Sequence, residues 1–299
     1  MERLFKVAGI GEILWDVLPK GKQLGGAPCN FAYHALQCDL DAYVISAIGA
    51  DKDGDEILQV LDDLDLNYSL VQKNNSYPTG RVTVALDEAG IPDYTIHENV
   101  AWDHIEQNKN LKAFAKTTDA VCFGSLAQRS PVSMDAIRNF LENTPSDCLK
   151  VFDINLRKNF YNREIILKSF EYANVLKLND DELTVVASFF GYAGNEETIL
   201  RQILKEFDLK LVAFTKGTKG SVLLTHDEIS FSEIKRVEVK DTVGAGDAFT
   251  AILVVGMLNK VKLKIIHQAA TNVASYVCSE DGATPKLPEE LLELIINNQ

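Results

Sequence analysis

Residues 240–249 read Lys-Asp-Thr-Val-Gly-Ala-Gly-Asp-Ala-Phe, and an apolar stretch, Ala248–Leu258, continues from them. Glycines at 244 and 246 flank an alanine, so little side-chain bulk stands where this stretch is expected to begin a helix. At such a start, successive backbone N–H groups can converge on one point, and the helix dipole adds positive potential there. The turn is therefore a candidate site for an anion.

The same turn carries a carboxylate, Asp247. Transfer of a γ-phosphoryl group needs donors for the charge on its equatorial oxygens and a neighbouring carboxylate to accept the proton of the attacking hydroxyl. This turn offers both groups. The alternative is that Asp247 is an ordinary N-cap and the glycines form a tight turn, and the motif alone leaves both interpretations open.

Around this motif, short β-rich runs alternate with amphipathic segments along most of the chain. The predicted buried strands are Val7–Ile10, Tyr43–Ser46, Ala120–Phe123, Val151–Ile154, Val175–Leu178 and Leu211–Phe214. The predicted helices between and after them include Asp53–Leu64, Val132–Glu142, Asn195–Phe207 and Leu263–Val277. This alternation predicts an α/β fold with a largely parallel sheet and helices on both of its faces.

Two segments break the alternation, Gly11–Leu24 and Asn67–His97. Both alternate apolar and polar residues between turn signals, which is typical of half-exposed antiparallel ribbon. We predict that they form a small β lid over a cleft at the carboxyl ends of the core strands, where open α/β sheets place ligands. The chain is then one domain, residues 1–299, with a core of about 1–11, 25–66 and 98–299 and a lid of about 12–24 and 67–97.

A second motif, Gly25-Gly26-Ala27-Pro28-Cys29-Asn30-Phe31-Ala32, ends the first lid segment and opens a helix. Its glycines would let the backbone approach a ligand closely, and Asn30 offers a donor and an acceptor to a sugar diol. Upstream, Asp16 stands where the lid would meet the cleft. The alternative is a turn followed by a helix cap.

Three further motifs follow predicted strands. Asn179-Asp180-Asp181-Glu182 is either a capping box or a pair, Asn179 and Glu182, that orders waters around Mg²⁺. Thr215-Lys216-Gly217-Thr218-Lys219-Gly220 is a Gly-x-x-Gly turn that suits a nucleotide or a hairpin. Asp153-Ile154-Asn155-Leu156-Arg157 sets polar groups at alternate positions, facing a cleft or solvent.

Composition narrows the classes of partner. The 299 residues carry a net charge of −13, which disfavours nucleic acid as a ligand. The five cysteines form no Cys-x-x-Cys pair, as expected in a reducing cytosol. No apolar run reaches the roughly 20 residues of a membrane helix, and we expect no leader peptide. These features predict a soluble cytoplasmic protein that binds neither nucleic acid nor membrane.

Taken in order, these motifs resemble the ribokinase and fructokinase family of carbohydrate kinases over essentially the whole chain. Asp-Thr-x-Gly-Ala-Gly-Asp is highly specific for that family. The resemblance implies a ribokinase-like three-layer sandwich with a β lid, and transfer of phosphate from ATP to a sugar hydroxyl. It makes Asp247 the base and the Gly244-Ala245-Gly246 turn, with the amides of Ala245, Gly246 and Asp247, the anion hole.

The remaining roles are also implied by the resemblance. Nucleotide binding falls to Asn179, Thr215, Gly217, Gly220 and Asn272, and sugar binding to Asp16, Gly26, Asn30 and Arg157. A Mg²⁺–phosphate network, held through water, falls to Asn179 and Glu182, and a monovalent cation such as K⁺ to Asp241, Val243 and Gly282. Family lids often clasp one another, so a homodimer through the lid is expected.

Within the family, several segments look most like fructokinases. They are Gly25–Ala32, Pro78-Thr79-Gly80-Arg81-Val82, Glu98–Asp103 and Gly282-Ala283-Thr284-Pro285. The expected reaction is therefore conversion of D-fructose to fructose 6-phosphate. A sugar phosphate is disfavoured, since the lid offers mainly Lys20, Lys22, Lys73 and Arg81 as cations.

Several alternatives stay open. Kinases of the same fold acting on 2-keto-3-deoxygluconate, ribose or a nucleoside are the nearest, and Arg157 suits the carboxylate of the first. A catalytically inactive sugar sensor is another. A dinucleotide enzyme is disfavoured because Gly9-Ile10-Gly11 lacks the third glycine, Leu14 standing in its place, and no ordinary P-loop occurs.

Overall fold

A computed structural model describes residues 4–18, 21–86, 92–234 and 237–296 of the chain. Within these ranges the main sheet has nine strands in the order β13-β12-β11-β10-β9-β8-β1-β4-β5. Their bounds are β1 Lys6–Ile10, β4 Asp41–Gly49, β5 Asn67–Asn74, β8 Ala120–Phe123, β9 Leu149–Asp153, β10 Val175–Asn179, β11 Leu211–Thr215, β12 Ser221–Leu224 and β13 Ile229–Ser232. The strands from β11 to β5 pair in parallel, and β12 and β13 add an antiparallel edge.

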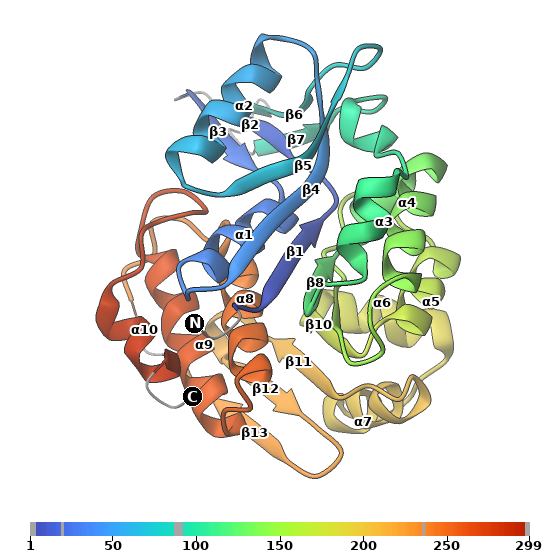
Figure 1. Cartoon of the computed structure of the whole chain (residues 1–299). Helices are drawn as coiled ribbons and strands as arrows, with labels where there is room; N and C mark the ends of the chain where they lie inside the picture. The colour runs from blue at the N-terminus through green and yellow to red at the C-terminus, as the bar shows by residue number, and fades with distance from the viewer. Residues whose placement is uncertain (1–3, 19–20, 87–91, 235–236, 297–299) are drawn as a thin grey trace.

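Helices cover both faces of this sheet (Figure 1). One face carries α1 Ala27–Leu36, α2 Lys52–Asp63, α8 Ala245–Leu258, α9 Leu263–Cys278 and α10 Glu289–Ile296. The other carries α3 Lys109–Ala115, α4 Pro131–Glu142, α5 Arg163–Tyr172, α6 Asp180–Phe190 and α7 Glu196–Glu206. Each face has its own cluster of buried apolar side chains, because strands covered on both sides bury both sets of alternating residues. The predicted three-layer α/β fold is confirmed.

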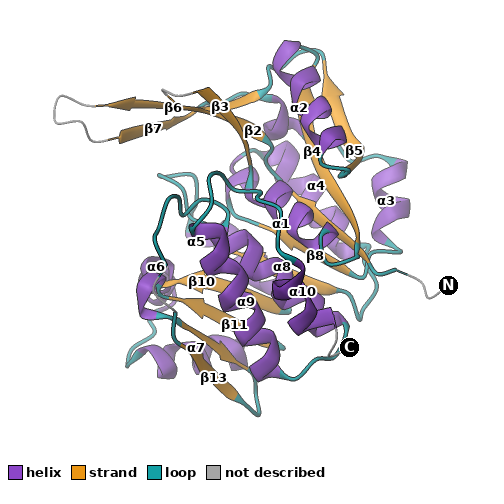
Figure 2. Ribbon diagram, turned by 90° about the vertical axis from the view of Figure 1, so that its left-hand side faces the viewer, coloured by secondary structure: helices purple, strands orange, loops and turns teal. Residues whose placement is uncertain are grey.

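A separate sheet forms the lid, in the order β3-β2-β6-β7. Its strands are β2 Leu14–Leu18, β3 Gly21–Gly25, β6 Gly80–Leu86 and β7 Pro92–Ile96. Figure 2 shows this sheet projecting from the body of the molecule. β2 pairs antiparallel with β3, and β6 pairs antiparallel with β7, while β2 and β6 pair in parallel across the middle.

One lid boundary differs from the prediction. Residues 67–74 were expected in the lid, but β5 pairs in parallel with β4 and ends the main sheet. An edge strand of the main sheet is half exposed, as a lid strand is, so the same alternation suits both positions. The second lid segment therefore begins with β6 at Gly80.

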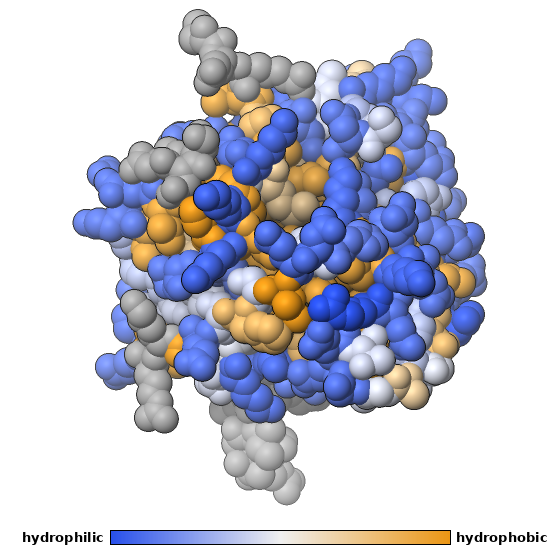
Figure 3. Space-filling model, turned by 90° about the horizontal axis from the view of Figure 1, so that it is seen from below, coloured by the Kyte–Doolittle hydropathy of each residue, from blue (hydrophilic) through white to orange (hydrophobic). Residues whose placement is uncertain are grey.

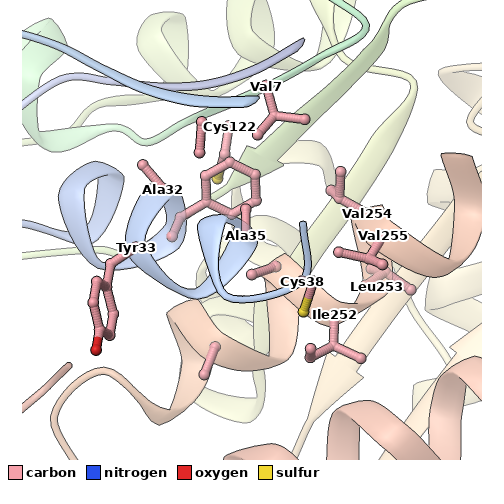
Figure 4. Close-up of a cluster of buried hydrophobic side chains, with 14 of the residues drawn as sticks. Val7, Ala32, Tyr33, Ala35, Cys38, Cys122, Ile252, Leu253, Val254 and Val255 are labelled. Carbon is pink, nitrogen blue, oxygen red and sulfur yellow. The ribbon is translucent and has the colours of Figure 1, made fainter. Parts of the chain in front are cut away.

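The first core cluster brings together helices that are far apart in sequence. α8 is buried from Ala248 to Gly256 and packs against α1. Figure 4 shows side chains of both helices, with Val7 of β1 and Cys122 of β8, in this cluster. Packing α1 on α8 brings the residues at the two helix starts side by side.

The surface seen in Figure 3 is mainly hydrophilic, with apolar groups showing between the polar ones. No helix in the described part of the chain is long and apolar enough to cross a membrane.

Candidate active site

The candidate site lies where the parallel strands end. β1, β9, β10 and β11 run parallel or are linked by parallel strands, so their carboxyl ends meet at one edge of the sheet. The chain leaves β1 for the lid at this edge, and it returns from β3 directly into α1. The motifs singled out in the sequence therefore face one another there.

The start of α8 has the geometry that the Gly-Ala-Gly motif predicts. Gly244 is the N-cap, with φ +79°, in the left-handed region that favours glycine. A β-carbon there would collide with the carbonyl of Ala283. The helix begins at Ala245, and the N–H groups of its first turn have no acceptor within the helix. These donors are available to an anion.

Asp247, in that first turn, is joined to α1. Asn30 Nδ2 donates a hydrogen bond of 2.8 Å to Asp247 Oδ2. Asn30 is 3% exposed, and its Oδ1 has no hydrogen-bond partner among the described residues. α1 starts after Gly26, whose φ of +119° and close packing against the Glu12 carbonyl exclude a side chain. The two strongest motifs therefore meet at one carboxylate.

The surroundings of Asp247 bring the pKa of its carboxyl close to neutrality. Burial, with the charge of Asp153 adding to it, raises its pKa to about 7, although the Asn30 hydrogen bond and the charges of Lys177 and Arg157 act in the opposite direction. A general base works best with a pKa near the operating pH. Asp247 is thus poised to accept a proton at neutral pH.

The predicted sugar residues from the lid root lie near the same carboxylate. Asp16, on β2, faces Gly25, where a β-carbon would collide with its carboxylate. Burial raises the pKa of Asp16 to about 6, and the charge of Arg157 opposes that rise. Arg157 is exposed, and its Nη1 donates to the Leu156 carbonyl at 3.2 Å. Its charge acts on both Asp16 and Asp247, so the structure brings these residues together.

Glu12 is a site neighbour that sequence reasoning missed. It is 3% exposed, and its Oε2 has no hydrogen-bond partner among the described residues. Burial raises its pKa to about 7, with opposing contributions that include Arg157, while Asp247 raises it further. A charged residue directly after a buried strand, Gly9-Ile10-Gly11-Glu12, was the signal available in the sequence.

A cavity of about 270 Å³ adjoins the start of α8. It is lined by Thr215, Gly217, Thr218, Gly220, Ser221, Ile234, Val237, Val239, Thr242, Ala245, Gly246, Phe249, Thr271, Ala274, Ser275 and Cys278. Three predicted nucleotide residues, Thr215, Gly217 and Gly220, are among them. The cavity runs from the Gly-x-x-Gly turn to Gly246, so a ligand filling it would present one end to the anion site.

Asn272 is not in this lining. Its Oδ1 accepts a hydrogen bond of 2.9 Å from Gln268 Nε2 on the same helix. Because residues spaced three and four apart share a face, Thr271, Ala274, Ser275 and Cys278 of α9 line the cavity, and Asn272 lies beside that face. Asn272 is therefore outside the cavity lining, and its contact with the nucleotide stays a prediction.

Asn179 and Glu182 form a reciprocal capping box. Asn179 Oδ1 accepts from the Glu182 N–H at 2.9 Å, and Glu182 Oε2 accepts from the Asn179 N–H at 2.8 Å. Glu182 Oε1 accepts from the Leu156 N–H at 3.0 Å. No group of three or more His, Cys, Asp or Glu that could cage a metal occurs in the described ranges. The donor set therefore fits Mg²⁺ that is carried by phosphates and reached through water, and does not fit a protein cage.

The segments expected to hold a monovalent cation are neighbours. Gly244 packs against Ala283, so the chain around Asp241 and Val243 lies beside the chain around Gly282. Asp241 Oδ1 accepts from the Val243 N–H at 3.0 Å, which fixes that turn.

A buried cation, Lys177, lies beside Gly246 at the start of α8. Lys177 Nζ donates to Asp153 Oδ1 at 3.0 Å. Thr250 Oγ1 lies 3.2 Å from Asp153 Oδ2 and 2.9 Å from the Gly246 carbonyl, and its one proton can be donated to either. Lys177 and Asp153 are 8% and 3% exposed. Lysine within the run Val-Leu-Lys-Leu was the signal in the sequence, and it was read only as part of a strand.

Comparison with known proteins agrees with this arrangement. The model of the pfkB family carbohydrate kinases matches residues 20–290. A fructokinase of Salmonella typhimurium is 26% identical over 264 residues, covering 84% of each chain. An ATP-dependent 6-phosphofructokinase of Thermoanaerobacterium thermosaccharolyticum is 25% identical over 311 residues, covering 96% of this chain and 92% of that protein.

Among solved structures, a sugar kinase from Pyrococcus horikoshii in complex with ATP matches with a TM-score of 0.81 and 25% identity, covering 97% of each chain. The family model spans most of the chain, and the relatives are covered over most of their own length. The chain belongs to the pfkB family of carbohydrate kinases.

Proposed function

We propose that this kinase transfers the γ-phosphoryl group of ATP to the primary 6-hydroxyl of D-fructose. The observation that carries the proposal is the hydrogen bond from Asn30 to Asp247, because it sets a sugar-binding amide beside a carboxylate that can accept the hydroxyl proton. ATP as donor is supported by the cavity that reaches Gly246 and by the ATP bound to the Pyrococcus horikoshii kinase.

In this mechanism the sugar diol pairs with Asp16 and with Oδ1 of Asn30, which has no partner among the residues that the structure describes. Asp247 accepts the proton of the 6-hydroxyl as its oxygen attacks the γ-phosphorus. The amides of Ala245, Gly246 and Asp247 donate to the equatorial phosphoryl oxygens, whose charge must be stabilised in the transition state. These amide dipoles take the place of water around the phosphoryl group, and they do not have to reorient during the reaction.

A neutral sugar suits the site better than a sugar phosphate. Lys20 lies outside the described residues, and the described cations of the lid are already paired: Lys22 with Asp53 and Glu56, and Arg81 with Asp53. Lys73, on β5, pairs with Asp55. A second phosphate would need cations that these carboxylates already neutralise.

Arg129 is also paired with a carboxylate, so it does not supply a cation for a second phosphate. It is buried and pairs with Asp103 through Nε and Nη2, at 2.8 and 2.9 Å. Its guanidinium also lies over the rings of Trp102 and Phe160, at 4.0 and 4.5 Å from their centroids. The exposed Arg157 is the basis of the second candidate, 2-keto-3-deoxygluconate, since a guanidinium can clamp a carboxylate bidentately. With fructose as substrate, Arg157→Lys should reduce activity only modestly.

Two cations are part of the proposal. Asn179 and Glu182 would order water around Mg²⁺ that enters with the nucleotide, and the Asp241, Val243 and Gly282 segment would hold K⁺ through backbone carbonyls. Mg²⁺ supplies positive charge to the phosphates when it is bound. The protein residues position the water and the turn.

A dimer through the lid is proposed from the open ribbon. β3 and β7 are the edge strands of the lid sheet, and Tyr94 on β7 is 49% exposed. Proteins usually cover such edges and apolar groups.

The position at which fructose is phosphorylated can be tested directly: ³¹P–¹³C coupling in the product made from fructose and ATP should identify C6. Coupling to C1 would contradict the assigned position.

A further inference from the structure

Lys177 occupies an unusual position for a lysine. It lies in the middle of β10, between Leu176 and Leu178, and it is 8% exposed. Its side chain crosses to β9, where Nζ meets Asp153 Oδ1 at 3.0 Å. Thr250 Oγ1 of α8 lies 3.2 Å from the other Asp153 oxygen and 2.9 Å from the Gly246 carbonyl, so the pair contacts the helix that carries Asp247.

The ammonium lies directly against the candidate anion hole. A β-carbon built on Gly246 would stand 3.0 Å from Lys177 Nζ. Gly246 also lines the cavity proposed for the nucleotide. Gly246 therefore borders both the cavity and the Lys177 ammonium. Because glycine has no β-carbon, the ammonium can approach the helix start from the side of the sheet.

The ammonium stays charged there. Burial by itself lowers the pKa of Lys177, but the charges of Asp153, Glu182 and Asp247 outweigh burial and hold the pKa above its usual value. An ammonium has three N–H donors, and Asp153 accepts from one of them. Within the described part of the chain, this leaves donors of the ammonium for a ligand at the helix start.

A purely structural role does not explain this arrangement well. A buried ion pair is expensive to desolvate, and apolar residues of similar size often replace one without loss of stability. Three acidic groups surround this one lysine. Their negative charge would repel an incoming polyphosphate unless a cation such as the Lys177 ammonium contacts the phosphate.

We propose that Lys177 is a catalytic residue, whose ammonium donates to an equatorial oxygen of the γ-phosphoryl group as that group passes over Gly246. In the step, the sugar oxygen forms a bond to the γ-phosphorus, and the bond to the β,γ-bridging oxygen breaks. Its electron pair leaves on ADP, and the hydroxyl proton goes to Asp247. Lys177 keeps its proton and stabilises charge. This inference rests on the proposed anion hole at the start of α8.

The test compares nucleotides that differ in the γ-phosphate. Binding of Mg²⁺–ADP and of the Mg²⁺ complex of the β,γ-imido analogue of ATP is measured by calorimetry for the wild type and for Lys177→Met. Contact with the γ-phosphate predicts a loss of about 10- to 100-fold for the analogue and less than about 3-fold for ADP. The value of kcat should fall by about 10²–10³, as for loss of an oxyanion donor.

Two further variants keep the test decisive. Lys177→Met combined with Asp153→Asn removes both charges of the ion pair, so no unpaired carboxylate is left buried at Asp153. The double variant should show the same selective loss of affinity for the β,γ-imido analogue relative to ADP. Lys150→Met, near the start of β9, is the matched control and should leave both affinities unchanged.

An unchanged ratio of analogue to ADP affinity in the single and double variants would overturn the role of Lys177. So would wild-type turnover in either variant. Because the binding measurement needs no sugar, it tests Lys177 even if fructose proves to be the wrong acceptor. Failure of the wild type to phosphorylate any sugar would instead count against the proposed function.

Discussion

Asn30 of α1 and Asp247 of α8 share a hydrogen bond of 2.8 Å, although 217 residues separate them in the sequence. Each residue had been singled out in its own glycine-containing motif, one for the sugar and one for the base. The bond fixes the orientation of the carboxylate and leaves Asn30 Oδ1 for a ligand. In the proposed mechanism, this bond couples sugar recognition by Asn30 to proton transfer by Asp247.

Asp247→Asn should fold and lose on the order of 10²–10⁴ in kcat, the usual contribution of a general base. Nucleotide affinity should change little, since the backbone amides remain. Steady-state kinetics and ADP binding check both parts. Asp227→Asn, in an exposed turn, is the control and should behave as wild type. Near-normal turnover of Asp247→Asn would show that another group accepts the proton.

The pH dependence of kcat/KM should rise through about pH 7, because Asp247 must lose its proton to act as base and its pKa is about 7. Glu12 has a similar pKa, so Glu12→Gln should retain this limb if Asp247 is responsible. If the rise of kcat/KM near pH 7 disappears in Glu12→Gln, the titrating group is Glu12 and not Asp247.

The same carboxyl should affect stability. The folded-state pKa of Asp247, about 7, exceeds its usual 3.8, so the folded protein binds more protons and its stability falls as pH rises through that window. Asp247→Asn removes this fall. It should raise the unfolding free energy by on the order of 1–3 kcal/mol at pH 8, and by less toward pH 4. Thermal melts at both values check the sign.

Asp16→Ala should raise KM for the sugar far more than KM for ATP. Loss of a hydrogen bond to a charged group in a closed cleft costs about 1–3 kcal/mol, or roughly 5- to 150-fold in affinity. Asp16→Asn retains an acceptor and should recover part of the loss. Equal effects on both substrates would show that Asp16 shapes the lid without contacting the sugar.

The monovalent cation can be tested by replacement. If K⁺ orders the turn around Asp241 and Val243, activity should be higher in KCl than in choline chloride at matched ionic strength. Equal rates in KCl, NaCl and choline chloride would remove this cation from the account.

The fold followed from the sequence because buried parallel strands have a distinctive pattern. Five of the six predicted runs, among them Ala120–Phe123 and Leu211–Phe214, lie wholly in strands of the main sheet, and the sixth, Val151–Ile154, extends one residue beyond β9. β5 was misplaced because a half-exposed edge strand has the same alternation as a lid strand. Its hydrogen-bonding partner, β4, decides between the two, and local periodicity does not contain that information.

The site was predictable only where a motif is local. The turn around Asp247 and the motif around Asn30 each predict the start of a helix. Lys177 and Glu12 matter through contacts with residues distant in sequence, so strand topology had to bring them to the site. For Asn272, a shift of one residue along α9 changes the helix face, and the motif does not fix which face borders the cavity.

The central claim is tested most directly by the choice of acceptor. ADP release from ATP should be measured with fructose, 2-keto-3-deoxygluconate, ribose, a nucleoside and fructose 6-phosphate under the same conditions. We predict the highest kcat/KM for fructose and a strong loss of its turnover in Asp247→Asn. A kcat/KM at least tenfold higher for 2-keto-3-deoxygluconate or fructose 6-phosphate would contradict fructose as the substrate.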